Sequence, residues 1–220
     1  MKTLNKKIAV ILSGCGNKDG SEITEAVSLI INLSKLGAEV EYFAPNEEFT
    51  AMNFVTNHEL DNKRNMMIEA ARITRSKIKD LELLNADHFD GLALPGGYGV
   101  AKNLSSWATH GSKCQVNPLV AKAIKNFHQQ SKPIAAICIA PVLVAKVLGA
   151  HKVTVTIGDD KETIQEILKT GAQHEICPVD DYVTDRECKV ITTPAYMYAA
   201  LPYQVFEGIA KLSKEFMEMA

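Results

Sequence analysis

Residues 133–148 read PIAAICIAPVLVAKVL, and this stretch decides the fold class. The apolar run at 133–137 predicts a buried strand. A helical pattern follows at 140–148, with Pro141 in its first turn, where a helix needs no backbone N–H donor. A buried strand that passes directly into a helix is typical of an α/β protein with a parallel sheet.

The rest of the chain repeats this alternation of apolar runs and amphipathic segments. Strands are predicted at 7–12, 38–43, 89–94, 153–157 and 190–193, and helices at 22–36, 116–129, 164–170 and 202–217. Gly37 stands where the first helix should end, so residues 7–43 form one βαβ unit. The sequence therefore predicts a doubly wound, mostly parallel sheet with helices on both faces.

Residues 46–86 interrupt this alternation. They are polar and irregular up to Asn62, and a helical pattern from Arg64 to Ile78 then predicts one helix. At 220 residues the chain fits one α/β domain over 1–220 better than two small ones. We therefore interpret 46–86 as an excursion from the sheet.

Composition excludes several classes of protein. The net charge of −2 gives no sign of the basic patch that a nucleic acid or an anionic membrane requires. The five cysteines are odd in number and show no C-x-x-C spacing, which is typical of free thiols in a reducing compartment. Leu12-Ser13-Gly14-Cys15 resembles a lipoprotein cleavage box, but the preceding apolar run is too short for a signal peptide. We expect a cytoplasmic protein.

Cys138 stands at the junction of the strand at 133–137 and the helix at 140–148. This placement is that of a nucleophile elbow with sulfur in place of oxygen. The positive end of the following helix should favour the thiolate and lower the pKa of Cys138. An inert buried cysteine at a strand end is an equally good interpretation from placement alone.

A glycine cluster, Pro95-Gly96-Gly97-Tyr98-Gly99, follows the strand at 89–94. Glycine lets the backbone approach a ligand closely and direct its N–H groups toward it. We expect the N–H groups of Gly97 and Ile139 to form an oxyanion hole. The alternative is an ordinary tight turn.

Glu22 and Glu25 open the first helix, where Ser21 can serve as the N-cap. Glu22 then complements the helix dipole, whereas burial of Glu25 among apolar neighbours would raise its pKa and suit it to proton transfer. The alternative for Glu25 is a carboxylate that faces solvent.

No motif indicates a metal or a cofactor. The six histidines lack ligand spacing, and the glycines at 14, 16 and 20 do not form a dinucleotide-binding loop.

Several motifs together resemble the PfpI-like superfamily that contains the parkinsonism-associated deglycase. They are Leu94-Pro95-Gly96-Gly97, Ala101-x-Asn103-Leu104 and Ala135-Ala136-Ile137-Cys138-Ile139-Ala140-Pro141. Further motifs are similar to those of the ElbB-type glyoxalases, the enhancing-lycopene-biosynthesis proteins: Ser13-Gly14-Cys15-Gly16, Asp19-Gly20-Ser21-Glu22, Ala70-Ala71-Arg72-Ile73-Thr74-Arg75 and Thr193-Pro194-Ala195-Tyr196-Met197.

The resemblance implies a flavodoxin-like, class I glutamine amidotransferase-like fold and a homodimer. It implies that Cys138 is the nucleophile and that a carboxylate of the first helix contacts it; Glu25 matches best and Glu22 is the reserve. We expect Cys15, Gly96, Asn103 and Thr193 to border the same pocket. The implied activity is a cofactor-free, glutathione-independent glyoxalase-like conversion of glyoxal or a related 2-oxoaldehyde to a hydroxy acid.

The sequence departs from this pattern because many relatives carry a histidine after the cysteine or in the strand that follows the elbow helix. Ile139 and Thr156-Ile157 occupy these positions here. The departure leaves open a non-catalytic thiol sensor or regulatory protein on the same fold. A glutamine hydrolase would need an H-x-E pair, which the sequence lacks.

Overall fold

The structure, a computed structural model, describes residues 6–220 and contains a seven-stranded central sheet in the order β10-β11-β7-β6-β1-β2-β5. All neighbouring strands pair in parallel except β10, which is antiparallel to β11. The strands are β1 (Lys7–Ile11), β2 (Glu39–Ala44), β5 (Lys79–Asp80), β6 (Gly91–Leu94), β7 (Ile134–Ile137), β10 (Val183–Asp185) and β11 (Val190–Thr193). The predicted fold class is confirmed.

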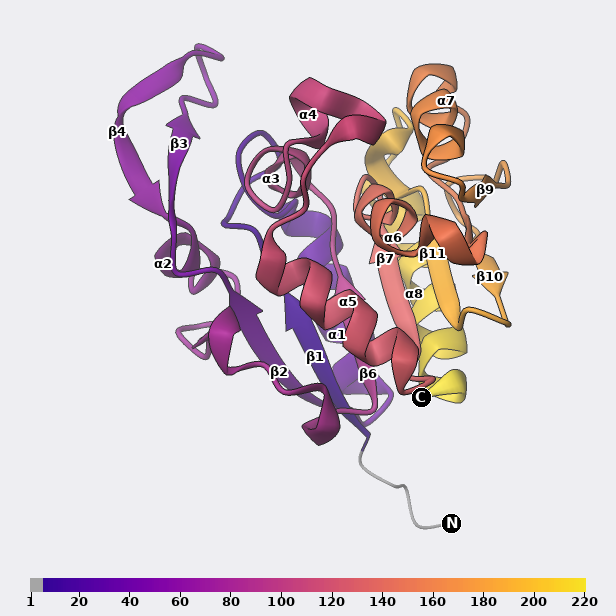
Figure 1. The fold of residues 1–220 in the computed structure, drawn as a ribbon. Helices are drawn as coiled ribbons and strands as arrows, with labels where there is room; N and C mark the ends of the chain where they lie inside the picture. Colours follow the sequence, from indigo (N-terminus) through magenta and orange to yellow (C-terminus); the bar gives the residue numbers. More distant parts are fainter. Residues whose placement is uncertain (1–5) are drawn as a thin grey trace.

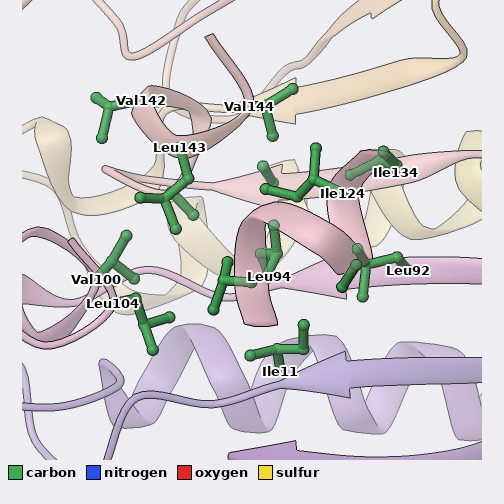
Figure 2. Packing of buried hydrophobic residues seen from close by; sticks show 14 of the residues in the cluster. Ile11, Leu92, Leu94, Val100, Leu104, Ile124, Ile134, Val142, Leu143 and Val144 are labelled. Atoms are coloured by element: carbon green, nitrogen blue, oxygen red, sulfur yellow. The ribbon is translucent and has the colours of Figure 1, made fainter. Parts of the chain in front are cut away.

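Helices cover both faces of the sheet (Figure 1). One face packs against α1 (Ile23–Lys35) and α8 (Pro202–Met219), and the other against α3 (Tyr98–Lys102), α5 (Pro118–Gln129) and α6 (Pro141–Leu148). Figure 2 shows the second of these layers, where Leu92 and Leu94 of β6 meet Ile124 of α5 and Leu143 of α6. The strands β6 and β7 are therefore buried on both sides and consist of apolar residues without alternation.

The chain reverses its direction across the sheet between β1 and β6. From β1 the chain first adds β2 on one side, and later returns to add β6 on the other side. The loops after β1 and β6 therefore lie next to each other at the carboxyl ends of the strands, and the Tyr98 N–H donates to the Asn17 carbonyl across them at 2.7 Å. Ligands bind at such a switch point in open α/β sheets.

The excursion at 46–86 differs from its prediction. It contains an antiparallel hairpin of β3 (Glu48–Met52) and β4 (Glu59–Asn65), and α2 spans only Met66–Ala70. Arg75 and Ser76 both adopt positive φ, which is incompatible with a continued right-handed helix. The hairpin extends away from the sheet (Figure 1), and the Met52 N–H donates to Asp19 Oδ2 at 2.6 Å, which ties the hairpin to the loop after β1.

The predicted strand at 153–157 is shorter than expected and does not join the central sheet. Its core is β8 (Thr154–Val155), which pairs with β9 (Gln173–His174) in a separate two-stranded sheet. The remaining helices are α4 (Trp107–His110) and α7 (Lys161–Lys169), with single 3-10 turns at Leu81–Leu83, Ala86–His88, Gly111–Lys113, Gly149–His151 and Ala195–Met197.

Phe216 provides a test of the packing of α8 on the sheet. Its ring is fully buried and lies over Gly91 of β6, where a Cβ atom would come within 2.6 Å of the ring. We predict that Phe216→Ala lowers the free energy of unfolding by about 3–5 kcal/mol, since the substitution leaves a cavity. Tyr203→Ala on the same helix is the control, because Tyr203 is 59% exposed. Equal losses for both variants in urea unfolding would contradict this packing.

Candidate active site

Cys138 lies on a strained turn between β7 and α6. Its φ is 62°, in the left-handed region that residues with a Cβ rarely adopt. The Cys138 N–H donates to the Thr193 carbonyl of β11 at 2.9 Å, so the neighbouring strand fixes the turn. The expected elbow is confirmed, and it directs the sulfur to the carboxyl ends of the strands.

The Glu25 carboxyl group lies beside this sulfur and has no exposed surface. Oε2 accepts the Gly96 N–H at 3.1 Å, and Oε1 accepts the Tyr196 N–H at 3.2 Å. A Cβ atom at Gly96 would lie 2.4 Å from Cys138 Cβ and 2.6 Å from Glu25 Oε2. The absent side chain of Gly96 therefore allows the thiol and the carboxyl group to approach each other.

The N–H groups of Gly97 and Ile139 both point at the Cys138 sulfur. Gly97 adopts a φ of 99°, and a Cβ there would lie 2.3 Å from the Gly20 carbonyl oxygen. Glycine is thus required for the chain to present this N–H. Both donors stabilise negative charge on the sulfur and act to lower the pKa of Cys138.

Two interlocked loops hold these parts in place. Asn103 Nδ2 donates to the carbonyls of Ser13 and Asp19 at 3.1 and 2.7 Å, and the Glu22 N–H donates to the Gly96 carbonyl at 3.0 Å. Asn103 therefore positions the loop after β1 and does not line the cavity.

Glu22, and not Ser21, is the N-cap of α1. Its Oε2 accepts the Glu25 N–H at 2.7 Å, whereas the Ser21 hydroxyl accepts the N–H of Ser13 at 2.9 Å. The expected cap is wrong because Ser21 closes the loop after β1. Glu22 also lines the cavity.

Burial sets the protonation of the central pair. Complete desolvation, strengthened by the nearby charge of Glu22, raises the pKa of Glu25 to about 8, as predicted in direction. Burial also raises the pKa of the Cys138 thiol well above its usual range, and the Glu25 charge adds to this effect. The expectation of a lowered pKa for Cys138 is wrong, because desolvation outweighs the N–H groups of Gly97 and Ile139.

The thiol opens into a cavity of about 570 Å³. Its walls come from loops at the carboxyl ends of the strands and from the start of α7: Asn17, Glu22, Gly97, Tyr98, Cys138, Ile139, Asp160, Thr163, Tyr196 and Met197. The sequence predictions missed Asn17, Tyr98, Asp160, Thr163, Tyr196 and Met197. The available signal was their position in segments that follow predicted strands or precede a predicted helix.

Three further residues that were expected in the pocket do not line the cavity. Gly96 separates the thiol from the carboxyl group, and Thr193 donates its hydroxyl to the Asp181 carbonyl at 2.7 Å. Cys15 is half-buried, with Glu69, Arg72 and Asp19 as its charged neighbours, and burial raises its pKa. None of the three lines the cavity.

The cavity wall contains no histidine within residues 6–220. Over the same residues, no group of histidine, cysteine and acidic side chains has the arrangement of a metal site. No helix within that range has the length and apolar character needed to cross a membrane.

The sequence profile of the DJ-1/PfpI family matches residues 6–197, which include the elbow, the glycine loop and both glutamates. The chain belongs to the DJ-1/PfpI family. The match ends before α8, although α8 helps to cover one face of the sheet.

Individual DJ-1/PfpI relatives cover nearly the whole chain. The human mitochondrial glutamine amidotransferase-like class 1 domain-containing protein 3 is 40% identical over 97% of this chain and 83% of its own length. The zebrafish mitochondrial ES1 protein is 34% identical over 98% and 86%. The crystal structure of an isoprenoid biosynthesis protein with an amidotransferase-like domain from Ehrlichia chaffeensis is 36% identical, covers 97% of this chain and 99% of its own, and superimposes with a TM-score of 0.92.

The expected cytoplasmic location is wrong by this comparison. Curated DJ-1/PfpI relatives from human, rat and zebrafish are all mitochondrial proteins by name. Composition did not reveal this, because free thiols and a balanced charge suit more than one reducing compartment.

The protonation of Glu25 in this DJ-1/PfpI protein should make the free energy of unfolding decrease as the pH rises. The pKa rises from 4.5 to about 8 on folding, so the folded state retains a proton that the unfolded chain loses. The stabilisation is complete below pH 4.5 and is lost as the pH rises toward 8. We predict that the free energy of unfolding falls by about 2–4 kcal/mol over this range through Glu25, and that Glu25→Gln removes this component.

The measurement is urea unfolding of both proteins across the same pH range. Glu41→Gln is the control, because the ion pairs of Glu41 with Lys7 and Lys79 lower its pKa, so that its own contribution changes only below pH 4.5. Identical pH profiles for the wild type and Glu25→Gln would show that Glu25 is already ionised when buried.

Proposed function

We propose that this DJ-1/PfpI protein is a cofactor-independent, glyoxalase-type enzyme that converts glyoxal or a related 2-oxoaldehyde to a hydroxy acid. The observation that carries the proposal is a buried thiol that faces a cavity, with a carboxyl group of pKa about 8 behind it and two N–H groups beside it. In this proposal the thiol is the nucleophile, the carboxyl group carries the proton and the two N–H groups form the oxyanion hole, all in contact with the Cys138 sulfur.

In the first step the Cys138 sulfur bonds to one aldehyde carbon. The C=O π electrons move to the oxygen, which the N–H groups of Gly97 and Ile139 stabilise. The thiol proton passes to Glu25 in the fraction of molecules in which this group is ionised, and then to the oxygen, which gives a hemithioacetal.

In the second step Glu25 removes the proton from the carbon that carries sulfur and returns it to the neighbouring carbonyl carbon, while the hydroxyl proton of the hemithioacetal moves to the oxygen of that neighbouring carbon through an enediol. The product is a thioester of a 2-hydroxy acid, with no net oxidation. Water then cleaves the C–S bond and restores the thiol, so the sum for glyoxal is one water added to give glycolic acid. A pKa of about 8 suits this role, because a proton carrier works best when its pKa is near the ambient pH.

A thiol-based redox sensor is the second candidate, and the absence of histidine from the cavity wall within residues 6–220 supports it. Oxidation favours exposed thiols of low pKa, whereas Cys138 is 7% exposed and its pKa is raised by burial. We therefore place the enzyme first. Glutamine hydrolysis has no support, since the sequence lacks an H-x-E pair.

The direct test is glyoxal turnover by the wild type and three variants. We predict that Cys138→Ala reduces turnover to the buffer rate and that Glu25→Gln lowers kcat/KM by roughly 10²–10⁴-fold, because proton transfer loses its carrier. Cys114→Ala is the control, since Cys114 is buried outside the cavity wall. Equal turnover by the wild type and Cys138→Ala would end the proposal.

A further inference from the structure

The wall of the cavity carries two carboxyl groups, those of Glu22 and Asp160. No lysine, arginine or histidine of residues 6–220 lines it. The ionisable side chains in the cavity wall are therefore all acidic. A cavity with negative charge concentrates positively charged ligands.

Both carboxyl groups cap helices that point their positive ends at the cavity. Glu22 caps α1, and Asp160 caps α7 by accepting the Thr163 N–H with Oδ1 at 2.8 Å. Helix N-termini are ordinarily sites for anions. Here the chain's own carboxylates occupy these two positions.

Asp160 is the stronger fixed charge of the two. Hydrogen bonds from Thr163 lower its pKa, whereas burial raises the pKa of Glu22. The side chain of Asp160 is exposed and lines the same cavity as Cys138.

Lys102 is a cation near the cavity-wall residue Tyr98, and its ion-pair partner lies outside the wall. Lys102 Nζ lies 5.9 Å from the centre of the Tyr98 ring, on α3, and its partner is Glu59 of the hairpin at 3.6 Å. Tyr98 and Tyr196 instead offer the cavity two aromatic rings, which attract ammonium groups at close range.

The volume of about 570 Å³ also exceeds what a two-carbon aldehyde fills, and is in the range of cavities that hold much larger ligands. We propose that the cavity selects a reactive carbonyl compound that carries a protonated amino group, with Asp160 as the group that binds this charge, and that it excludes 2-oxo acids. This inference rests on the proposed function, because it names the substrate class for the same thiol.

The selection is measurable through the thiol alone, without turnover. Two methanethiosulfonate reagents of similar size differ in charge, one with a trimethylammonioethyl and one with a sulfonatoethyl group. In each case the Cys138 sulfur bonds to the reagent's sulfenyl sulfur, the reagent's S–S bond breaks, methanesulfinate leaves with the electron pair, and the thiol proton goes to solvent. Peptide mass spectrometry follows the adduct at Cys138 against time.

The quantity compared is the rate of the cationic reagent divided by that of the anionic one, and this ratio is normalised by the same ratio measured with mercaptoethanol. We expect the normalised ratio for Cys138 to be about ten at low salt. Asp160→Asn should reduce this normalised ratio at least about threefold, because Asn remains an N-cap while the charge is removed. Glu162→Gln removes a charge from the same first turn of α7 outside this cavity wall, and should leave the ratio unchanged.

A normalised ratio of one or below in the wild type, or an unchanged ratio in Asp160→Asn, would overturn the inference. If Asp160→Asn fails to fold, the wild-type ratio in high salt decides instead: screening should bring it toward one, and a salt-independent ratio would overturn the inference. Glyoxal turnover that does not depend on Cys138 would end the proposed enzyme while leaving this charge selection standing, so the two failures are distinguishable.

Discussion

The buried carboxyl group of Glu25 is the constraint on which the site depends. Its two oxygens accept N–H groups from the loops after β6 and β11, and its third neighbour is the Cys138 sulfur after β7. One side chain of α1 thus links three strand ends that are far apart in sequence. Because the group is fully desolvated, its proton is held to about pH 8, and the reactivity of the thiol is tied to that proton.

This coupling keeps the thiol protonated at rest. Its resting form is protonated and buried, and the N–H groups of Gly97 and Ile139 stabilise negative charge only once it develops on sulfur or on a bound oxygen. A site of this kind is preorganised for an addition step, whereas a freely ionised thiolate would be open to oxidants. In the proposed selection, the carboxyl groups of Glu22 and Asp160 in the cavity wall favour cationic electrophiles on their way to the sulfur.

The sequence predicted those parts of the site that depend on residues close together in the chain. The run into Cys138 predicted the elbow, the helical spacing predicted that Glu25 is buried, and Gly97 stands where only glycine fits. Tyr196 and Asp160 were missed because the strand order, which no local pattern contains, brings them to the cavity. The sign of the Cys138 pKa was missed because it depends on depth in the folded chain. The hairpin at 48–65 was missed because its second strand is polar and mostly exposed, so it shows no apolar alternation.

The central claim is that Glu25 retains its proton at neutral pH beside the thiol. Infrared difference spectroscopy between the wild type and Glu25→Gln measures this directly, through the carbonyl stretch of a protonated carboxylic acid. We predict that the wild type shows this band at about pH 6 and loses it with a midpoint near pH 8. Only the ionised carboxylate at about pH 6 would contradict the account, because burial would then not hold the proton on Glu25.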